Sequence, residues 1–358
     1  MTESDRAVTD RPLLEVTDLA VSFKVARARG SWTRPVVRAV DGVSLRIEAG
    51  ETLGLVGESG SGKSTTGRAV LQLVPADAGS ISLDGTDLAS AGAKGRDLLR
   101  KRVQMVFQDP FGSLNSRMRV GDIVREPLEI QRIGDRATRR CRVTEILDLV
   151  GLPADAVRRY PHEFSGGQRQ RIGIARALAV EPALVVCDEP VAALDVSVQA
   201  QILKLLKDLQ RETGVAYLFI AHDLNVVRHV SRRTAVMYLG KIVEQGPSNL
   251  LFASPRHPYT QALTSAIPVP DPDAPRRRLV LTGEIPSPTN PPSGCRFRTR
   301  CPYAQPRCAA EEPLLQPAGD GVSVACHFWQ QIAQAKETTK PEGERPSHPC
   351  NDSEEERE

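Results

Sequence analysis

One glycine-rich segment constrains this chain more than any other feature of its sequence. It follows a short apolar run at Glu51–Val56 and consists of Gly57, Glu58, Ser59, Gly60, Ser61, Gly62, Lys63, Ser64 and Thr65. Glycines between a strand and a helix let backbone N–H groups face inward, and these groups and the helix start attract phosphate oxygens. We therefore predict a P-loop in which Lys63 reaches the β- and γ-phosphates and the Ser64 hydroxyl binds Mg²⁺.

An acidic pair follows a second apolar run. Ala183–Cys187 has the composition of a buried strand, and Asp188 and Glu189 come directly after it. In a chain without a P-loop, such a pair is usually a helix cap or a solvated turn. Beside a P-loop strand, Asp188 suits Mg²⁺, and Glu189 is placed to polarise the water that attacks the γ-phosphate.

A third motif, Ser165, Gly166, Gly167 and Gln168, stands at the start of a predicted helix over Gln168–Leu178. Serine is a common N-cap, and the glycines fit that structural interpretation. The same residues offer free amides and a hydroxyl at a helix N-terminus, which is also a second phosphate-binding site. Both interpretations stay open on the residues alone.

Other segments predict the surrounding α/β structure. Gly121–Leu178 has a mostly helical pattern. A further helix is predicted by apolar residues at helical spacing, namely Val198, Ile202, Leu205, Leu206 and Leu209. Short apolar segments predict strands at Leu13–Phe23, Val43–Ile47, Ser80–Leu83, Val103–Phe107 and Ala216–Ala221. Thr234–Gln245 predicts a hairpin that turns at Gly240.

The charge and hydropathy of the chain exclude several classes of partner. A formal net charge of +3 is too small to indicate nucleic acid or an anionic membrane as the main partner. Met1–Pro12 lacks the apolar core of a signal peptide, and no apolar run approaches the ~20 residues that a membrane helix needs. We therefore expect a cytosolic chain that meets the membrane through a partner.

The order of the motifs resembles that of the ABC ATPase family, over roughly Leu13 to Gln245. The matching motifs are Gly57–Thr65, Gln108, Ser165–Gln168, Asp188-Glu189, Ala193-Leu194-Asp195 and His222. The resemblance implies a P-loop ABC cassette with a RecA-like core, an antiparallel β subdomain and an α-helical subdomain. It implies ATP and Mg²⁺ as ligands, with the metal held by Ser64, Gln108 and Asp188.

The resemblance also supplies roles for single residues of the nucleotide site. Gln108 would sense the γ-phosphate, and His222 would hold the γ-phosphate and Glu189 in line. Phe23 is expected to stack on adenine, with a core strand residue as the alternative.

The same resemblance implies a dimer of cassettes. Ser165–Gln168 would bind the γ-phosphate of ATP held by the partner cassette, and Asp195 would communicate across the dimer. One departure from the family pattern is Ala192, where a serine is frequent, and it removes one hydroxyl near the expected dimer contact.

Several further stretches resemble one branch, the ATP-binding subunits of oligopeptide and dipeptide importers. They are Gly54–Gly60, Phe107–Pro110, Ser113–Asn115, His257–Thr260, Gly283–Pro288 and Pro291–Cys301. The loop between Phe23 and Asp41 resembles that of the second of the two ATPase subunits of such importers. A nickel or other small-solute importer ATPase is the alternative, and a soluble non-transport ABC ATPase or an iron–sulfur enzyme or sensor is a more distant one.

This branch implies a set of partners at the cytoplasmic face of the membrane. They are a second, related ABC ATPase in a heterodimer, two integral-membrane permease subunits and an extracytoplasmic peptide-binding protein, with no nucleic acid. A groove near Gln108 and Gly121–Pro161 is expected to receive a cytoplasmic helix of a permease.

Four cysteines form a cluster near the C-terminal end. Cys295, Cys301, Cys308 and Cys326 have the spacing C-x5-C-x6-C-x17-C, which matches neither a zinc ribbon nor a bacterial ferredoxin closely. Arg296, Arg298, Arg300 and Arg307 are interspersed and are expected to favour thiolates.

Three states of this cluster are open. Resemblance to peptide-importer subunits implies a structural [4Fe–4S] cluster, with zinc, for which His327 is a possible ligand, or four unmetallated thiols as alternatives. The isolated Cys141 and Cys187 are expected to be small buried hydrophobes.

Changes of composition suggest the domain boundaries. We expect a disordered N-terminus over 1–12, an ABC ATPase domain over 13–250 with its helical subdomain at about 112–180, a C-terminal extension over 251–332 that holds the cysteine cluster, and a disordered tail over 333–358.

Overall fold

The computed structural model describes residues 11–25, 35–109, 111–267, 279, 281 and 283–338. The expected disorder of most of 1–12 and 333–358 falls outside the described residues. Within them, the last helix continues to Thr338, past the expected start of the tail at residue 333.

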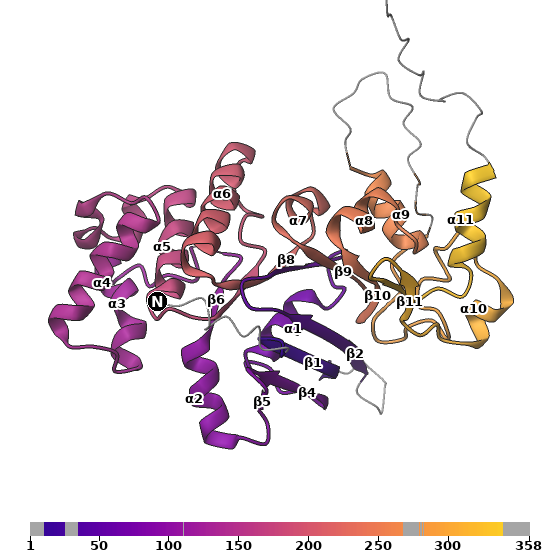
Figure 1. Cartoon of the computed structure of the whole chain (residues 1–358), viewed down its shortest axis with the longest axis horizontal. Coiled ribbons are helices and arrows are strands. Elements are labelled where there is room, and N and C mark those ends of the chain that lie inside the picture. The colour runs from indigo at the N-terminus through magenta and orange to yellow at the C-terminus, as the bar shows by residue number, and fades with distance from the viewer. Residues whose placement is uncertain are drawn as a thin grey trace, which may run out of the picture.

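An antiparallel sheet forms the lower part of the molecule as drawn in Figure 1. Within the described residues its four strands lie in the order β2-β1-β4-β5. Their bounds are Leu14–Lys24 (β1), Val36–Ile47 (β2), Ala78–Leu83 (β4) and Thr86–Asp87 (β5). Buried and exposed residues largely alternate along β2, as expected for a sheet with one face on the core. The strand begins earlier than the prediction from Val43.

The central sheet carries the P-loop strand in its interior. Its described strands lie in the order β11-β12-β10-β9-β3-β8-β7-β6, and the five from β9 to β6 are parallel. Their bounds are Thr52–Val56 (β3), Val103–Val106 (β6), Leu184–Asp188 (β7), Ala216–Ala221 (β8), Arg233–Tyr238 (β9), Lys241–Pro247 (β10), Gln316–Gly319 (β11) and Val322–Val324 (β12). The β9–β10 hairpin turns at Gly240, as predicted.

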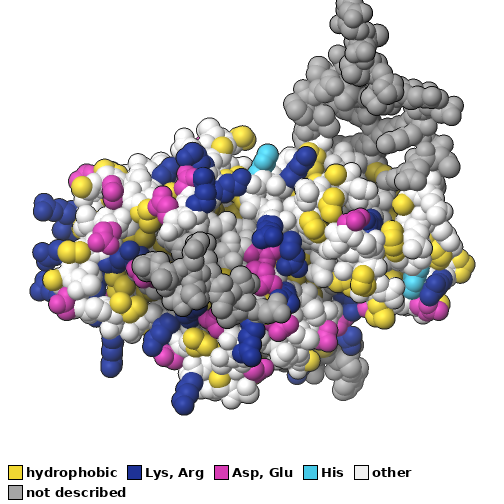
Figure 2. Space-filling model, in the orientation of Figure 1, with side chains coloured by type: hydrophobic (Ala, Val, Ile, Leu, Met, Phe, Trp, Pro, Cys, Tyr) yellow, Lys and Arg dark blue, Asp and Glu magenta, His cyan; other side chains and the backbone are white. Residues whose placement is uncertain are grey.

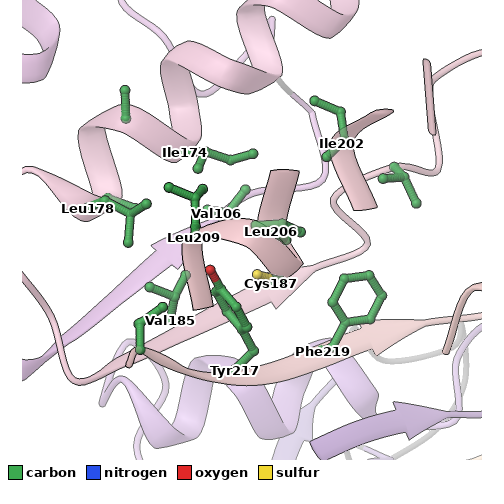
Figure 3. Close-up of a cluster of buried hydrophobic side chains, with 14 of the residues drawn as sticks. Val106, Ile174, Leu178, Val185, Cys187, Ile202, Leu206, Leu209, Tyr217 and Phe219 are labelled. Atoms are coloured by element: carbon green, nitrogen blue, oxygen red, sulfur yellow. The ribbon is translucent and has the colours of Figure 1, made fainter. Parts of the chain in front are cut away.

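Helices cover both faces of the parallel strands, which explains why those strands read as continuous apolar runs. The helices of the cassette core are α1 (Lys63–Val70), α2 (Gly92–Arg102), α6 (Val196–Thr213) and α7 (Leu224–Val230). Figure 3 shows side chains of α5 (Gly166–Leu178) and α6 directed onto the strands, namely Ile174, Leu178, Ile202, Leu206 and Leu209 against Val106, Val185, Cys187, Tyr217 and Phe219. The predicted apolar stripe of α6 therefore faces the core.

A helical region and a C-terminal extension lie at opposite ends of the molecule (Figure 1). The helical region comprises α3 (Val120–Ile130), α4 (Arg136–Leu149), α5 (Gly166–Leu178) and two short 3₁₀ helices, Ala154–Arg158 and Pro161–Glu163. The extension comprises α8 (Ser248–Ala253), α9 (Pro258–Ser265), α10 (Pro306–Ala310) and α11 (Trp329–Thr338). It is joined to the central sheet because β12 pairs with β10.

No helix among the described residues is both long enough and apolar enough to span a membrane. The face shown in Figure 2 mixes Lys and Arg with Asp and Glu side chains.

Candidate functional site

A cavity of about 450 Å³ opens beside the P-loop. Its walls come from segments that are far apart in the sequence: the P-loop, β2, and the loops that follow β6, β7, β8 and β9. The lining residues are Val37, Arg38, Ala39, Ser59, Gly60, Gly62, Lys63, Ser64, Thr65, Gln108, Glu189, His222, Leu239, Gly240 and Pro288. The structure therefore brings together the predicted P-loop, Gln108, Glu189 and His222.

The P-loop has the conformation that its glycines allow. Gly57 and Gly62 have φ values of 155° and 108°. A Cβ atom at Gly57 would lie 2.1 Å from the Met237 carbonyl oxygen, and one at Gly62 would lie 2.1 Å from the Ala39 carbonyl oxygen. Any side chain at either position would clash with backbone, so the loop needs glycine there.

Lys63 points back along the P-loop. Its Nζ donates to the carbonyl oxygens of Gly57 at 2.7 Å and of Glu58 at 3.0 Å. Burial lowers the pKa of Lys63, and the nearby carboxylates of Glu189 and Asp188 oppose that shift. A buried ammonium group with only carbonyl partners is suited to pair with the phosphate charge of a nucleotide.

Ser64 and Asp188 meet at the predicted metal position. The Ser64 hydroxyl donates to Asp188 Oδ1 at 2.6 Å, although the two residues lie on different elements, the start of α1 and the end of β7. Asp188 is buried, with 2% of its surface exposed. A hydroxyl and a carboxylate side by side are oxygen ligands of the kind that Mg²⁺ prefers, so these residues fit the metal.

Glu189 is the point where the remaining polar groups converge. Its Oε2 accepts a hydrogen bond from Gln108 Nε2 at 3.1 Å and lies 3.1 Å from His222 Nδ1. Glu189 has a φ of 46°, a backbone conformation that non-glycine residues rarely adopt. Strain of this kind is typical of functional positions, and here it accompanies a carboxylate that faces the cavity.

The third motif, Ser165–Gln168, caps α5 and does not line the cavity. Ser165 Oγ accepts from the Gln168 N–H at 3.4 Å, and Gln168 Oε1 accepts from the Ser165 N–H at 3.0 Å, which forms a capping box. A Cβ atom at Gly167 would lie 2.4 Å from Val198 Cγ1, so this glycine also permits close packing against α6. The N-cap interpretation is confirmed, and binding of a partner's ATP stays a prediction.

Two further predicted residues keep untested roles. Asp195 is the N-cap residue of α6, and its backbone oxygen accepts from the Gln199 N–H at 2.8 Å. Phe23 is 40% exposed and is not among the residues that line the cavity. Its stacking on adenine therefore stays a prediction.

Sequence reasoning missed part of the cavity wall. Arg38 on β2 and Pro288 in the C-terminal extension both line it. Neither lies in a nucleotide motif, and no local pattern connects Pro288 with a loop more than two hundred residues earlier. The run Gly283–Pro288 stood out only through its resemblance to peptide-importer subunits.

The four clustered cysteines line one small cavity of about 10 Å³, and His327 lines it too. This volume is close to the smallest that can hold one water molecule. Four sulfur donors around one cavity are the right kind and number of ligands for an iron–sulfur or zinc centre. Among the described residues, however, no three His, Cys, Asp or Glu side chains have an arrangement that would hold a metal ion.

The expectation that neighbouring arginines favour thiolates holds only in part. Burial raises the pKa of Cys295, and Arg298 lowers that pKa by less. Arg300 and Arg307 pair instead with Glu58 and Glu311. Burial raises the pKa of Cys301 to about 11 and that of Cys326 to about 12, so without a bound metal both remain thiols at neutral pH. The expectation for Cys141 is wrong, since its side chain is exposed on α4.

A second cavity, of about 390 Å³, lies between the cassette core and the helical region. It is lined by the segment after α1, by α2 and by the end of α3. Leu73 and Ile130 on its rim are 61% and 73% exposed. This groove overlaps the expected permease groove at α3 but does not include Gln108.

Comparisons with known proteins agree with this geometry. Residues 40–192 match the ABC transporter family, and residues 243–308 match the oligopeptide/dipeptide transporter C-terminal region. YkfD of Bacillus subtilis, named as an oligopeptide transport ATP-binding protein, is 51% identical over 92% of this chain and 99% of its own length. The oligopeptide transport ATP-binding protein OppF of Salmonella typhimurium is 53% identical over 85% of this chain and 92% of its own.

Solved cassettes share the fold of the described core. A dimeric ATP-binding cassette in a post-hydrolysis state, bound to ADP and Pi, superposes with a TM-score of 0.58 and 28% identity. The match covers 66% of this chain and 98% of that cassette.

Proposed function

The chain belongs to the ABC transporter family of ATPases, and from this premise we propose that it is the ATP-hydrolysing subunit of a peptide importer. The observation that carries the proposal is the convergence of Gln108 and His222 on the Glu189 carboxylate in the P-loop cavity. The names of the relatives and the match of residues 243–308 favour peptides over nickel or another small solute.

Each group in the cavity has a task in phosphoryl transfer to water, which is mainly a problem of positioning. The P-loop amides and Lys63 hold the phosphates, and Ser64 and Asp188, with Gln108, would hold Mg²⁺, which offsets the phosphate charge. Glu189 orients the attacking water and accepts its proton, while His222 keeps that carboxylate in place.

We further propose that the site is completed by a second, related ATPase subunit. Ser165–Gln168 lies outside the cavity of its own chain, and it offers a helix N-terminus to a phosphate of the partner's ATP. ATP would then hold two cassettes together, and loss of the γ-phosphate would release them. The related cassette that is dimeric with ADP and Pi bound supports this arrangement.

The proposed membrane partners are two permease subunits and an extracytoplasmic peptide-binding protein, which would place the chain at the cytoplasmic face of the membrane. The experiment is ATP-dependent uptake of a labelled peptide into proteoliposomes that contain this chain, its permeases and the second ATPase. Uptake of nickel without peptide uptake would favour the alternative importer, and a chain that assembles with no permease would favour a soluble ABC ATPase.

The groove beside Ile130 gives a prediction about the permease contact. An apolar rim that is 73% exposed at Ile130 suits an amphipathic helix from a partner. Ile130→Asp should lower the amount of permease that co-purifies by about tenfold, because a charge in an apolar contact costs well over 1 kcal/mol. The ATP affinity of the isolated chain should not change. Leu314→Asp, at a residue that is 70% exposed in the extension, is the matched control.

The cysteine cluster supports a second proposal, a structural [4Fe–4S] centre. Its support is the gathering of Cys295, Cys301, Cys308 and Cys326 around one cavity. Zinc, with His327 available as a ligand, and four free thiols are the competing outcomes.

Purified protein distinguishes these outcomes. We expect broad visible absorbance and about four iron atoms per chain, both lost in Cys308→Ser, because thiolate-to-iron charge transfer absorbs visible light. The matched control is Cys141→Ser, at an exposed cysteine far from the cluster in sequence. Equimolar zinc, or no metal with four titratable thiols, would refute the iron–sulfur proposal.

A further inference from the structure

The C-terminal extension contacts the P-loop at Glu58. Glu58, the second residue of the P-loop, does not line the nucleotide cavity, because its carboxylate is bound on the other side by Arg300. The guanidinium donates through two nitrogens, to Oε2 at 2.7 Å and to Oε1 at 3.1 Å. The Arg300 side chain is 7% exposed and that of Glu58 is 24% exposed. A two-point contact of this kind fixes direction as well as charge.

The backbone of the same P-loop residue is held by a second group of the extension. The Glu58 N–H donates to the Tyr259 hydroxyl at 2.9 Å. Tyr259 is fully buried on α9, and its ring packs against those of Tyr238 at 4.7 Å and Phe297 at 5.4 Å between centroids. The packed aromatic rings therefore fix the position of the Tyr259 hydroxyl beside the Glu58 N–H.

One short loop of the cysteine cluster supplies Arg300 and the ring that packs on Tyr259. Arg300 and Phe297 both lie between Cys295 and Cys301. Arg296, in the same loop, donates to the Asp41 carboxylate and to the Leu239 carbonyl oxygen. Loop 295–301 thus contacts the P-loop, β2 and the β9–β10 turn, all of which lie around the nucleotide cavity.

The charge of Glu58 explains why such a contact matters. A carboxylate in a loop that binds phosphates repels them unless a cation neutralises it and turns it away. In this chain both tasks fall to Arg300, which is far from the P-loop in sequence.

We propose that Arg300 and Tyr259 are positioning residues of the nucleotide site, and that loop 295–301 is a brace that keeps the P-loop in its phosphate-binding conformation. This proposal rests on the proposed function only in that the P-loop binds ATP. It assigns to the cysteine-bearing extension a direct effect on nucleotide affinity.

The test is a set of ATP dissociation constants for full-length variants, together with their kcat and KM. Arg300→Ala should weaken ATP binding about tenfold, which corresponds to 1.4 kcal/mol, because an unpaired carboxylate is left at the P-loop. Glu58→Gln should lose less ATP affinity than Arg300→Ala, because it removes the carboxylate charge and its amide oxygen can still accept one of the two hydrogen bonds from Arg300. In the Glu58→Gln background, Arg300→Ala should have little further effect. Arg300→Lys should restore part of the loss.

The matched control is Arg307→Ala. Arg307 belongs to the same extension and pairs with Glu311, but both side chains are 57% exposed. It should leave ATP affinity unchanged. Tyr259→Phe, which keeps the packed ring and removes only the hydroxyl, should weaken ATP binding by a few-fold and keeps the test available if Arg300→Ala does not fold.

Failure of the brace and failure of the proposed function give different results. Normal ATP affinity in Arg300→Ala, or a loss in Arg300→Ala that is just as large in the Glu58→Gln background, would overturn the brace, since the effect would then not depend on Glu58. A parent chain that does not bind ATP would instead overturn the proposed function.

Discussion

Glu189→Gln should abolish ATP turnover while ATP stays bound. The substitution removes the proton acceptor beside the attacking water but keeps an amide oxygen that can still accept the hydrogen bond from Gln108 Nε2. Phosphate binding by the P-loop and Lys63 is untouched. We expect phosphate release to fall by about 10²–10⁴-fold, the range typical of a lost general base. The measurement is single-turnover phosphate release together with retention of labelled ATP.

The control for this variant is Glu181→Gln. Glu181 is also a glutamate at a positive φ, but its side chain is 75% exposed and pairs with Arg142 on the surface. It should hydrolyse ATP at the parental rate. Near-parental phosphate release in Glu189→Gln would show that another group activates the water.

The second large effect is expected for Lys63→Ala. The Lys63 side chain is buried, with 5% of the residue exposed, and it lines the nucleotide cavity. Two lost charge-assisted hydrogen bonds, at about 1.5–3 kcal/mol each, correspond to a loss of ATP affinity of at least about 100-fold. The carbonyl oxygens of Gly57 and Glu58 would also lose their donor. Equilibrium binding of a fluorescent ATP analogue measures the effect.

Lys204→Ala is the matched control. Lys204 lies on α6, is 79% exposed and pairs with Asp208 at the surface. Its removal changes the net charge by the same amount without touching the cavity. If Lys63→Ala and Lys204→Ala bound ATP equally well, the P-loop would not be the nucleotide site.

Much of the site could be predicted because its motifs are local. A strand, a glycine-rich turn and a helix are contiguous in sequence, and so are β7 and the Asp188-Glu189 pair. The parallel sheet then brings the ends of β3 and β7 to one edge, which is why Ser64 and Asp188 meet. The capping of α5 by Ser165 follows equally from neighbouring residues.

The rest depends on contacts between distant parts of the chain. The ion pair between Glu58 and Arg300 joins residues 242 positions apart, and no pattern in the sequence predicts that they meet. The expectation about the arginines held only in part for the same reason, since nearness to a cysteine in sequence did not decide that Arg300 and Arg307 pair with carboxylates. The extension also contains helices and strands that its proline-rich composition concealed, among them α9 with Tyr259.

Peptide-dependent phosphate release from the assembled transporter tests the central claim most directly. The preparation contains this chain, its permeases and the second ATPase in lipid, with and without peptide-loaded binding protein. The account predicts that peptide stimulates phosphate release and that Glu189→Gln in this chain alone abolishes most of the stimulated rate. A rate that ignores peptide, or that persists unchanged in Glu189→Gln, would contradict it.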